Sequence, residues 1–125
     1  MRLHNFYFLG ILLLSFAIIG CNAPQALNTT VIKKVPPSSP LDCENAGGKW
    51  GPAGLSGSNI CNLPTADAGI ECSDSSECEG SCIADRAQYK GGVLHTRGKC
   101  TAWTSVFGCN AFVTNGIVQG VMCID

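Results

Sequence analysis

The sequence has little histidine and lacks the close cysteine spacing that is typical of metal and redox sites. It has two histidines, His4 and His95, and no Cys-x-x-Cys pair among its nine cysteines. Zinc sites in proteins are built from four nitrogen or sulfur ligands, commonly with a closely spaced cysteine pair. A thioredoxin-type site uses Cys-x-x-Cys itself. We therefore predict no metal ligands, no cofactor and no thioredoxin-type redox centre.

Positive charge is also sparse. Eight Lys and Arg residues stand against nine Asp and Glu, and the net charge is −1. A nucleic-acid-binding protein needs basic side chains gathered on one face. Here they are scattered, and the stretch from Glu71 to Glu79 is acidic. We predict that the chain binds no nucleic acid.

No apolar run is long enough to cross a bilayer as a stable helix. The run from Phe6 to Ile19 follows Arg2 and is interrupted only by Gly10 and Ser15. Its length of about 14 residues falls short of the ~20 that a spanning helix needs and is typical of a secretory signal peptide. We therefore predict an N-terminal signal helix over residues 1–20.

The signal ends in Ile18-Ile19-Gly20-Cys21, which resembles the lipobox of bacterial lipoprotein precursors. This resemblance implies cleavage before Cys21, lipid on its sulfur and often acylation of the new N-terminus, such as by palmitate. Ordinary secretion and an uncleaved anchor are the alternatives. Asn22 stands where an Asp retains enteric lipoproteins in the inner membrane, so the resemblance favours the outer membrane, facing the periplasm or the surface. The first partner is then the membrane itself, through the lipid on Cys21.

The stretch from Cys21 to Asp42 is rich in Pro and Ser and has few apolar side chains. Such a composition cannot bury enough surface to offset its ordering entropy. We expect a disordered tether over residues 21–42, with Lys33 and Lys34 in solvent. Contact of these two lysines with anionic headgroups is the weaker alternative.

Eight cysteines remain after Cys21. An even number in an exported chain indicates disulfides, so we predict a four-disulfide domain over residues 43–125. Such staples matter in a small domain, because its apolar side chains alone give a marginal core. The candidate core residues are the large apolar ones: Trp50, Leu55, Ile60, Leu63, Ile70, Ile83, Leu94, Trp103, Val106, Phe107, Phe112, Val113, Ile117, Val118, Val121 and Met122.

Two hairpins are expected in this domain. A short strand around Lys49-Trp50 is expected to pair with residues 59–62, which brings Cys43 near Cys61 and allows a bridge between them. In the second, Asn115-Gly116 indicates a type I′ turn between residues 109–114 and 117–123. Simple pairing sets Val113 opposite Val118 and leaves Cys109 one residue out of register with Cys123. A bulge at Gly120 would correct this and allow that bridge. The predicted fold class is a small disulfide-rich, β-hairpin-containing domain with little helix.

Candidate catalytic groups are few. Five acidic residues lie close together, but they lack the 1-3-5 ligand order of a calcium-binding EF-hand loop. His95 has no nucleophile at a recognisable spacing, and Trp50 is expected to cover the core. We predict no catalytic residues, with calcium binding as a minor alternative for the acidic set: Asp67, Glu71, Asp74, Glu77 and Glu79.

Several motifs resemble those of small, uncharacterised cysteine-rich lipoproteins of the bacterial envelope: Cys-Glu-x-x-Gly-Gly-x-Trp from Cys43, Asp67-Ala68-Gly69 before Cys72, the cluster Cys72, Cys78 and Cys82, Gly98-x-Cys100, Gly108-Cys109 and the final Cys123-Ile124-Asp125. This resemblance implies location and disulfides but no activity. The cluster followed by Cys100 also resembles half of the colipase and dickkopf cysteine pattern. That resemblance implies bridges from Cys72 to Cys82 and from Cys78 to Cys100. A bridge between Cys78 and Cys82 is disfavoured separately, because it would close a very tight ring.

The sequence thus predicts a membrane-anchored envelope lipoprotein that acts as a non-enzymatic interaction or structural module with an unidentified envelope partner. A protease inhibitor is the alternative from another class, with a disulfide-braced loop at Gly51 to Ser58 or Arg86 to Arg97. A carboxylate-based hydrolase is the weakest of the alternatives, because paired catalytic carboxylates need a cleft that fixes their separation.

Overall fold

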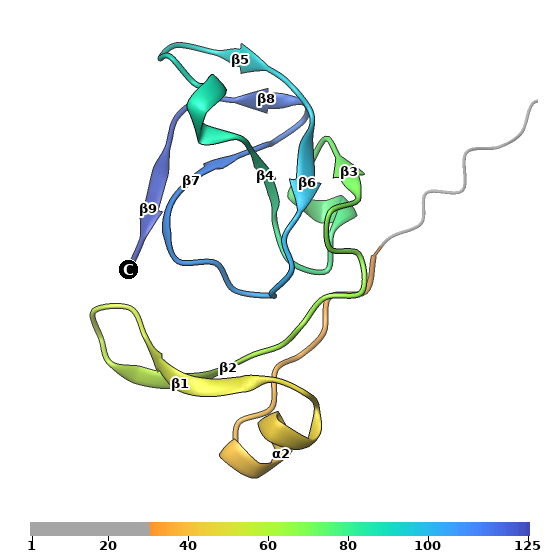
Figure 1. Cartoon of the computed structure of the whole chain (residues 1–125), viewed down its shortest axis with the longest axis vertical. Helices are drawn as coiled ribbons and strands as arrows, with labels where there is room; N and C mark the ends of the chain where they lie inside the picture. Colours follow the sequence, from red (N-terminus) through yellow and green to blue (C-terminus); the bar gives the residue numbers. More distant parts are fainter. Residues whose placement is uncertain (1–30) are drawn as a thin grey trace, which may run out of the picture.

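The computed structural model describes residues 31–125, so the predicted signal helix and Cys21 lie outside the described residues. The first element is the helix α2 (Pro40–Asn45), and Ser39 caps it by accepting a hydrogen bond from the Asp42 amide at 3.2 Å. An antiparallel hairpin follows, formed by β1 (Lys49–Ala53) and β2 (Ser58–Asn62) with Trp50 opposite Cys61. This is the first hairpin expected from the sequence. Helix α2 and this hairpin form the lower part of the molecule in Figure 1.

The remaining chain forms a small five-stranded antiparallel sheet in the order β3-β6-β4-β7-β9. Its strands are short: β3 (Glu71–Cys72), β4 (Cys82–Ala84), β6 (Gly98–Cys100), β7 (Gly108–Phe112) and β9 (Met122–Ile124). Two single turns of 3-10 helix, η1 (Ser75–Glu77) and η2 (Arg86–Gln88), flank β4. Little helix and many short strands confirm the predicted fold class. No helix within residues 31–125 has the length and hydropathy to cross a membrane.

The turn at Asn115-Gly116 forms as expected, but the second hairpin does not continue from it. Both turn residues have positive φ, 49° and 76°, which a type I′ turn requires. After the turn, β8 (Ile117–Val118) pairs with β5 (Leu94–His95) instead of β7. The expected pairing of Val113 with Val118 is therefore wrong. The amide of Val113 instead donates to the Cys82 carbonyl at 2.9 Å.

The chain returns to β7 only at β9, where Cys109 lies opposite Cys123. Thr114 lies opposite Ile117 at the turn. Between this pair and the pair Cys109 and Cys123, the chain after the turn has one residue more than the chain before it. We expected a single bulge at Gly120. Instead the whole segment 119–121 leaves the sheet, and the Tyr89 hydroxyl holds it by donating to the Gln119 carbonyl at 2.8 Å.

Four disulfides join the described cysteines in the pairs expected from the sequence. Their Cα atoms lie 5.5 Å apart for Cys43 and Cys61, 6.0 Å for Cys72 and Cys82, 5.4 Å for Cys78 and Cys100, and 3.8 Å for Cys109 and Cys123. The first bridge closes the β1–β2 unit. The next two cross within the sheet, and the last ties β9 to β7.

Sulfur fills much of the interior. One buried cluster contains four of the cysteines together with Ala111, Val113 and Val118, and a second contains Cys43, Cys61 and Leu63, covered by Trp50. The expected role of Trp50 is confirmed. Several large apolar residues expected in the core are instead exposed on turns and edges, because few elements of this small domain have a second layer to cover them: Leu55, Ile70, Phe107, Val121 and Met122.

Candidate functional site

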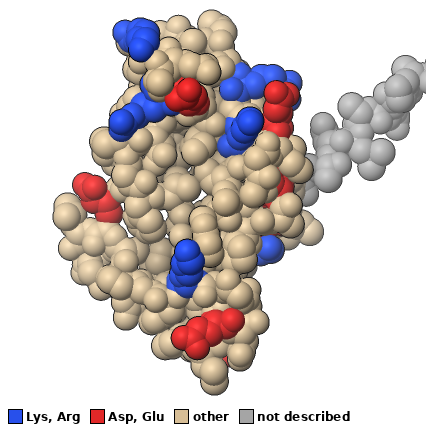
Figure 2. All heavy atoms as spheres, viewed as in Figure 1, with Lys and Arg blue, Asp and Glu red and all other residues tan. Residues whose placement is uncertain are grey.

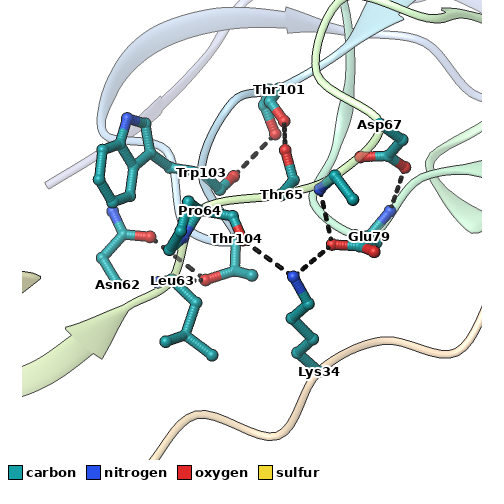
Figure 3. Close-up of polar contacts among 11 residues, drawn as sticks. Lys34, Asn62, Leu63, Pro64, Thr65, Asp67, Glu79, Thr101, Trp103 and Thr104 are labelled. Atoms are coloured by element: carbon teal, nitrogen blue, oxygen red, sulfur yellow. Dashed lines mark hydrogen bonds and ion pairs between the residues drawn. The ribbon is translucent and has the colours of Figure 1, made fainter. Parts of the chain in front are cut away.

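A network of polar contacts joins the β1–β2 unit to the chain around the five-stranded sheet, and Figure 3 shows most of its members. We call this network the polar junction: Lys34, Asn62, Thr65, Asp67, Glu79, Thr101 and Thr104. The Asn62 amide donates to the Ser105 carbonyl at 2.9 Å, and its oxygen accepts from the Ser105 amide at 2.9 Å. The Leu63 amide donates to Thr104 Oγ1 at 3.1 Å. Each contact spans about 40 residues, so the junction sets how the two units meet.

Thr101 is the buried centre of the junction, with 5% of its surface exposed. Its hydroxyl accepts from the Ser81 amide at 3.0 Å and donates to the Trp103 carbonyl at 2.9 Å. A Cβ on Gly80 would lie 2.3 Å from this hydroxyl. Glycine is therefore required there for the close approach of the two segments. No sequence pattern indicated this group, because its members are distant along the chain.

The segment before α2 is attached to the junction by two lysines. Lys33 donates to the Gly80 carbonyl at 3.0 Å and Lys34 to the Pro64 carbonyl at 3.1 Å. Lys34 also lies 3.0 Å from Glu79 Oε2. Gly80 is buried, and a buried carbonyl without a partner would be unfavourable, so the Lys33 ammonium satisfies it. The contact of Lys34 with Pro64 is exposed. We call residues 31–39 the arm.

The arm contains most of the described part of the predicted tether, of which residues 21–30 lie outside the described residues. The prediction that Lys33 and Lys34 lie in solvent is wrong, because both contact the domain. The helix that begins at Pro40 is close to the expected start of order near Leu41. Composition predicted the absence of apolar burial, and Ile32 and Val35 are indeed 86% and 90% exposed. It did not reveal that two ammonium groups would find carbonyl and carboxylate partners far along the chain.

We expect Glu79→Gln to free the arm. Loss of the carboxylate removes the ion pair with Lys34, in which the lysine side chain is 43% and the glutamate side chain 18% exposed. Ion pairs that are open to solvent have small effects, so trypsin should cleave after Lys34 a few-fold faster than in the parent protein. Timed digestion followed by mass spectrometry measures this rate. Glu71→Gln is the matched control, because Glu71 pairs at 3.5 Å with Arg97 and not with the arm. Equal cleavage rates in both variants would contradict the role of Glu79.

The acidic residues of the central loop are used as turn and arm partners. Asp74 accepts from the Ser76 amide at 2.8 Å and from the Asn115 amide at 3.0 Å, and these amides lower its pKa. The Ser73 hydroxyl and amide lower the pKa of Glu77. Hydrogen bonding from Lys34, then from the Ala66 amide, lowers the pKa of Glu79. A general acid needs a raised pKa, so the direction of these three shifts is opposite to that role.

The acidic set does not converge on one ligand position. In residues 31–125, the groups of three side chains close enough to share an ion are Cys72, Cys78 and Cys82, and Asp67, Cys78 and Cys100. Both rely on sulfurs that are bonded in disulfides, and a metal needs the thiolate. Asp67 accepts from the Glu79 amide at 2.7 Å through one oxygen, and its other oxygen is buried without a partner.

His95 and the candidate inhibitor loops lie on the surface of the domain. His95 is exposed on β5 opposite Ile117. The Gly51 to Ser58 segment continues β1 into a turn, and Leu55 at its tip is 92% exposed. The Arg86 to Arg97 segment contains η2 and β5. Lys and Arg side chains are spread over the face seen in Figure 2, with acidic side chains between them.

An open cavity of about 330 Å³ lies beside the β1–β2 turn and the end of the chain, both of which contribute to its lining. Its lining combines small polar and apolar side chains, including Ile60, Phe107 and Ile124, with the terminal Asp125. Among the titratable groups, only Asp125 contributes to this lining, so the cavity has no pair of acids at a fixed separation. Comparisons with protein-family models, curated proteins and solved structures give no match to this chain.

Proposed function

We propose that this protein is a lipid-anchored protein of the bacterial envelope whose disulfide-stapled domain is a non-enzymatic interaction or structural module. The lipobox-like Ile18-Ile19-Gly20-Cys21 supports the anchor. The observation that carries the proposal is the set of four disulfides. Disulfides form and persist in oxidising compartments such as the periplasm and the cell surface, and all eight cysteines after Cys21 are used in them.

The geometry of the domain favours binding over catalysis. Asp74, Glu77 and Glu79 each accept hydrogen bonds that hold turns or the arm in place. A hydrolase of the carboxylate type needs two such groups facing one cleft. An inhibitor needs an extended loop, whereas Gly54 and Gly57 fold the Gly51 to Ser58 segment into a turn with positive φ of 63° and 65°. The hydrolase and an inhibitor loop at Gly51 to Ser58 therefore receive less support than an interaction module.

The arm also limits how far the domain stands from its anchor. Nine residues separate Cys21 from Val31, where the described chain begins. Ten Cα to Cα steps span at most about 35 Å when fully extended. With Lys33 and Lys34 attached to the domain, the proposed anchor would keep the polar junction close to the membrane surface. A partner would then be met at the membrane, in the same leaflet or in the layer next to it.

Cys21→Ala is expected to abolish membrane anchoring in the bacterial host. One myristoyl-sized chain alone binds membranes only marginally, and removal of every acyl chain on Cys21 should move the protein from the detergent phase to the aqueous phase in Triton X-114 partition. Intact mass should show loss of the lipid. Asn22→Asp is the matched control, because it keeps the acylated cysteine and should remain in the detergent phase. Detergent partition and normal processing of Cys21→Ala would disprove the anchor.

A further inference from the structure

One disulfide differs from the other three in its exposure. The six cysteines of the inner bridges and of the β1–β2 unit have at most 4% of their surface exposed. Cys109 and Cys123 are both exposed, on neighbouring positions of β7 and β9. Thiol–disulfide exchange requires a thiolate to reach one sulfur of the bridge, and exposed bridges are the more readily reduced. An external thiol therefore meets Cys109–Cys123 first.

This bridge secures a strand that has few other attachments. β9 has three residues and lies at the edge of the sheet, with β7 as its neighbour. The segment 119–121 before it belongs to no strand, and Met122 is 60% exposed. Exposed backbone hydrogen bonds contribute little net free energy each. The covalent link is thus the main constraint on the end of the chain.

The same strand closes one side of the cavity next to the β1–β2 turn. Ile124 and Asp125 line it, together with Ile60 and Phe107. At the turn, a Cβ on Gly54 would lie 2.0 Å from the Asp125 carbonyl oxygen. The end of the chain therefore lies directly against the turn. Figure 1 shows the C-terminus just above the β1–β2 hairpin. Release of β9 would open the cavity and expose the edge of β7.

We propose that Cys109–Cys123 is a redox-controlled latch on β9, reduced by an external dithiol while the three buried bridges stay intact. A thiolate of the dithiol attacks one sulfur of the bridge, forms a mixed disulfide and releases the other cysteine as a thiolate, which takes up a proton. The second thiol of the dithiol then attacks its partner sulfur in the mixed disulfide and releases the second cysteine. The protein gains two electrons and two protons, and the dithiol becomes a disulfide.

Graded reduction of the full-length protein in detergent tests the order of reduction. Samples are treated with increasing dithiothreitol at neutral pH, trapped with N-ethylmaleimide and mapped by peptide mass spectrometry, which counts Cys21 separately. Cys109 and Cys123 should be labelled at reductant concentrations about ten-fold lower than the other six cysteines. Labelling of any buried bridge at the same concentration or a lower one would overturn the proposal.

Hydrogen exchange tests whether reduction releases the strand. In the reduced and trapped protein, amides in β9 should exchange at least about ten-fold faster, while those in β4 and β6 keep their rates. The double variant Cys109→Ser with Cys123→Ser should show the same pattern without any reductant. Unchanged protection of β9 in both samples would show that the bridge is accessible but is not a latch.

Discussion

Replacing Cys78 and Cys100 together by alanine is expected to leave the five-stranded sheet largely unfolded at 25 °C. The bridge closes a separation of 22 residues, for which the chain-entropy model gives about 3 kcal/mol. Both sulfurs are also buried in the main core cluster, with 0% and 4% exposure. Their removal leaves a cavity in a core that has few other large side chains to collapse into it. The summed loss approaches the whole free energy of unfolding of a small domain, about 5 kcal/mol.

The matched control removes the bridge between Cys109 and Cys123 in the same way. Its separation of 14 residues gives nearly the same chain-entropy contribution, again about 3 kcal/mol. Both residues are exposed, so no core cavity forms and most of the sheet should remain. Circular dichroism in increasing urea compares the two variants. Equal decreases in the free energy of unfolding would mean that the buried bridge contributes only through the entropy of the unfolded chain and not through packing.

Local patterns in the sequence predicted the elements that local chemistry determines. Asn115-Gly116 forms the expected turn because positive φ is a property of those two residues. The strand around Trp50 pairs with residues 58–62 because a short Gly-rich segment joins them. Both outer disulfides then follow, since each hairpin or strand pair brings its own cysteines together. The inner pairs were expected from a resemblance, together with the very tight ring that a Cys78 to Cys82 bridge would close, and not from a predicted hairpin.

Contacts between distant segments were not predictable in the same way. β8 leaves β7 for β5 because the turn is attached elsewhere, with Gly116 donating to the Ser73 carbonyl at 2.7 Å and Asn115 to Asp74 at 3.0 Å. The polar junction and the arm depend on similar long-range partners. Hydropathy also overestimated the number of large apolar side chains in the core. It does not indicate that disulfide sulfurs will occupy the interior while a side chain such as Met122 stays exposed.

Two glycines explain how disulfides and strands fit in so small a space. Cys72 on β3 and Cys82 on β4 are bridged although β6 lies between these strands. Gly98 on β6 is opposite Cys72, and a Cβ there would lie 2.8 Å from the Cys82 sulfur and 2.7 Å from the Ile83 carbonyl oxygen. The bridge passes over β6 where no side chain stands. Gly48 is placed in the same way next to the Cys43–Cys61 bridge. A Cβ there would lie 2.7 Å from the Cys43 sulfur and 2.8 Å from the Cys61 sulfur.

Gly98→Ala should therefore destabilise the domain although it adds a single methyl group. The contacts it would make are to a strand backbone and a bridged sulfur, neither of which can rotate away, and overpacking of this kind costs about 1–3 kcal/mol. Urea denaturation should show a lower midpoint. If the variant fails to fold, the number of free thiols after oxidative refolding should rise, because Cys72 and Cys82 can no longer approach each other.

Gly51→Ala is the control, since Gly51 also lies in a strand but has no atom within 4 Å of an added Cβ. Neither glycine has positive φ, so the comparison isolates the close approach from any backbone strain. The control should stay within about 0.5 kcal/mol of the parent protein. A Gly98→Ala protein as stable as the control, with four intact bridges, would mean that the Cys72–Cys82 bridge does not need the open space over β6.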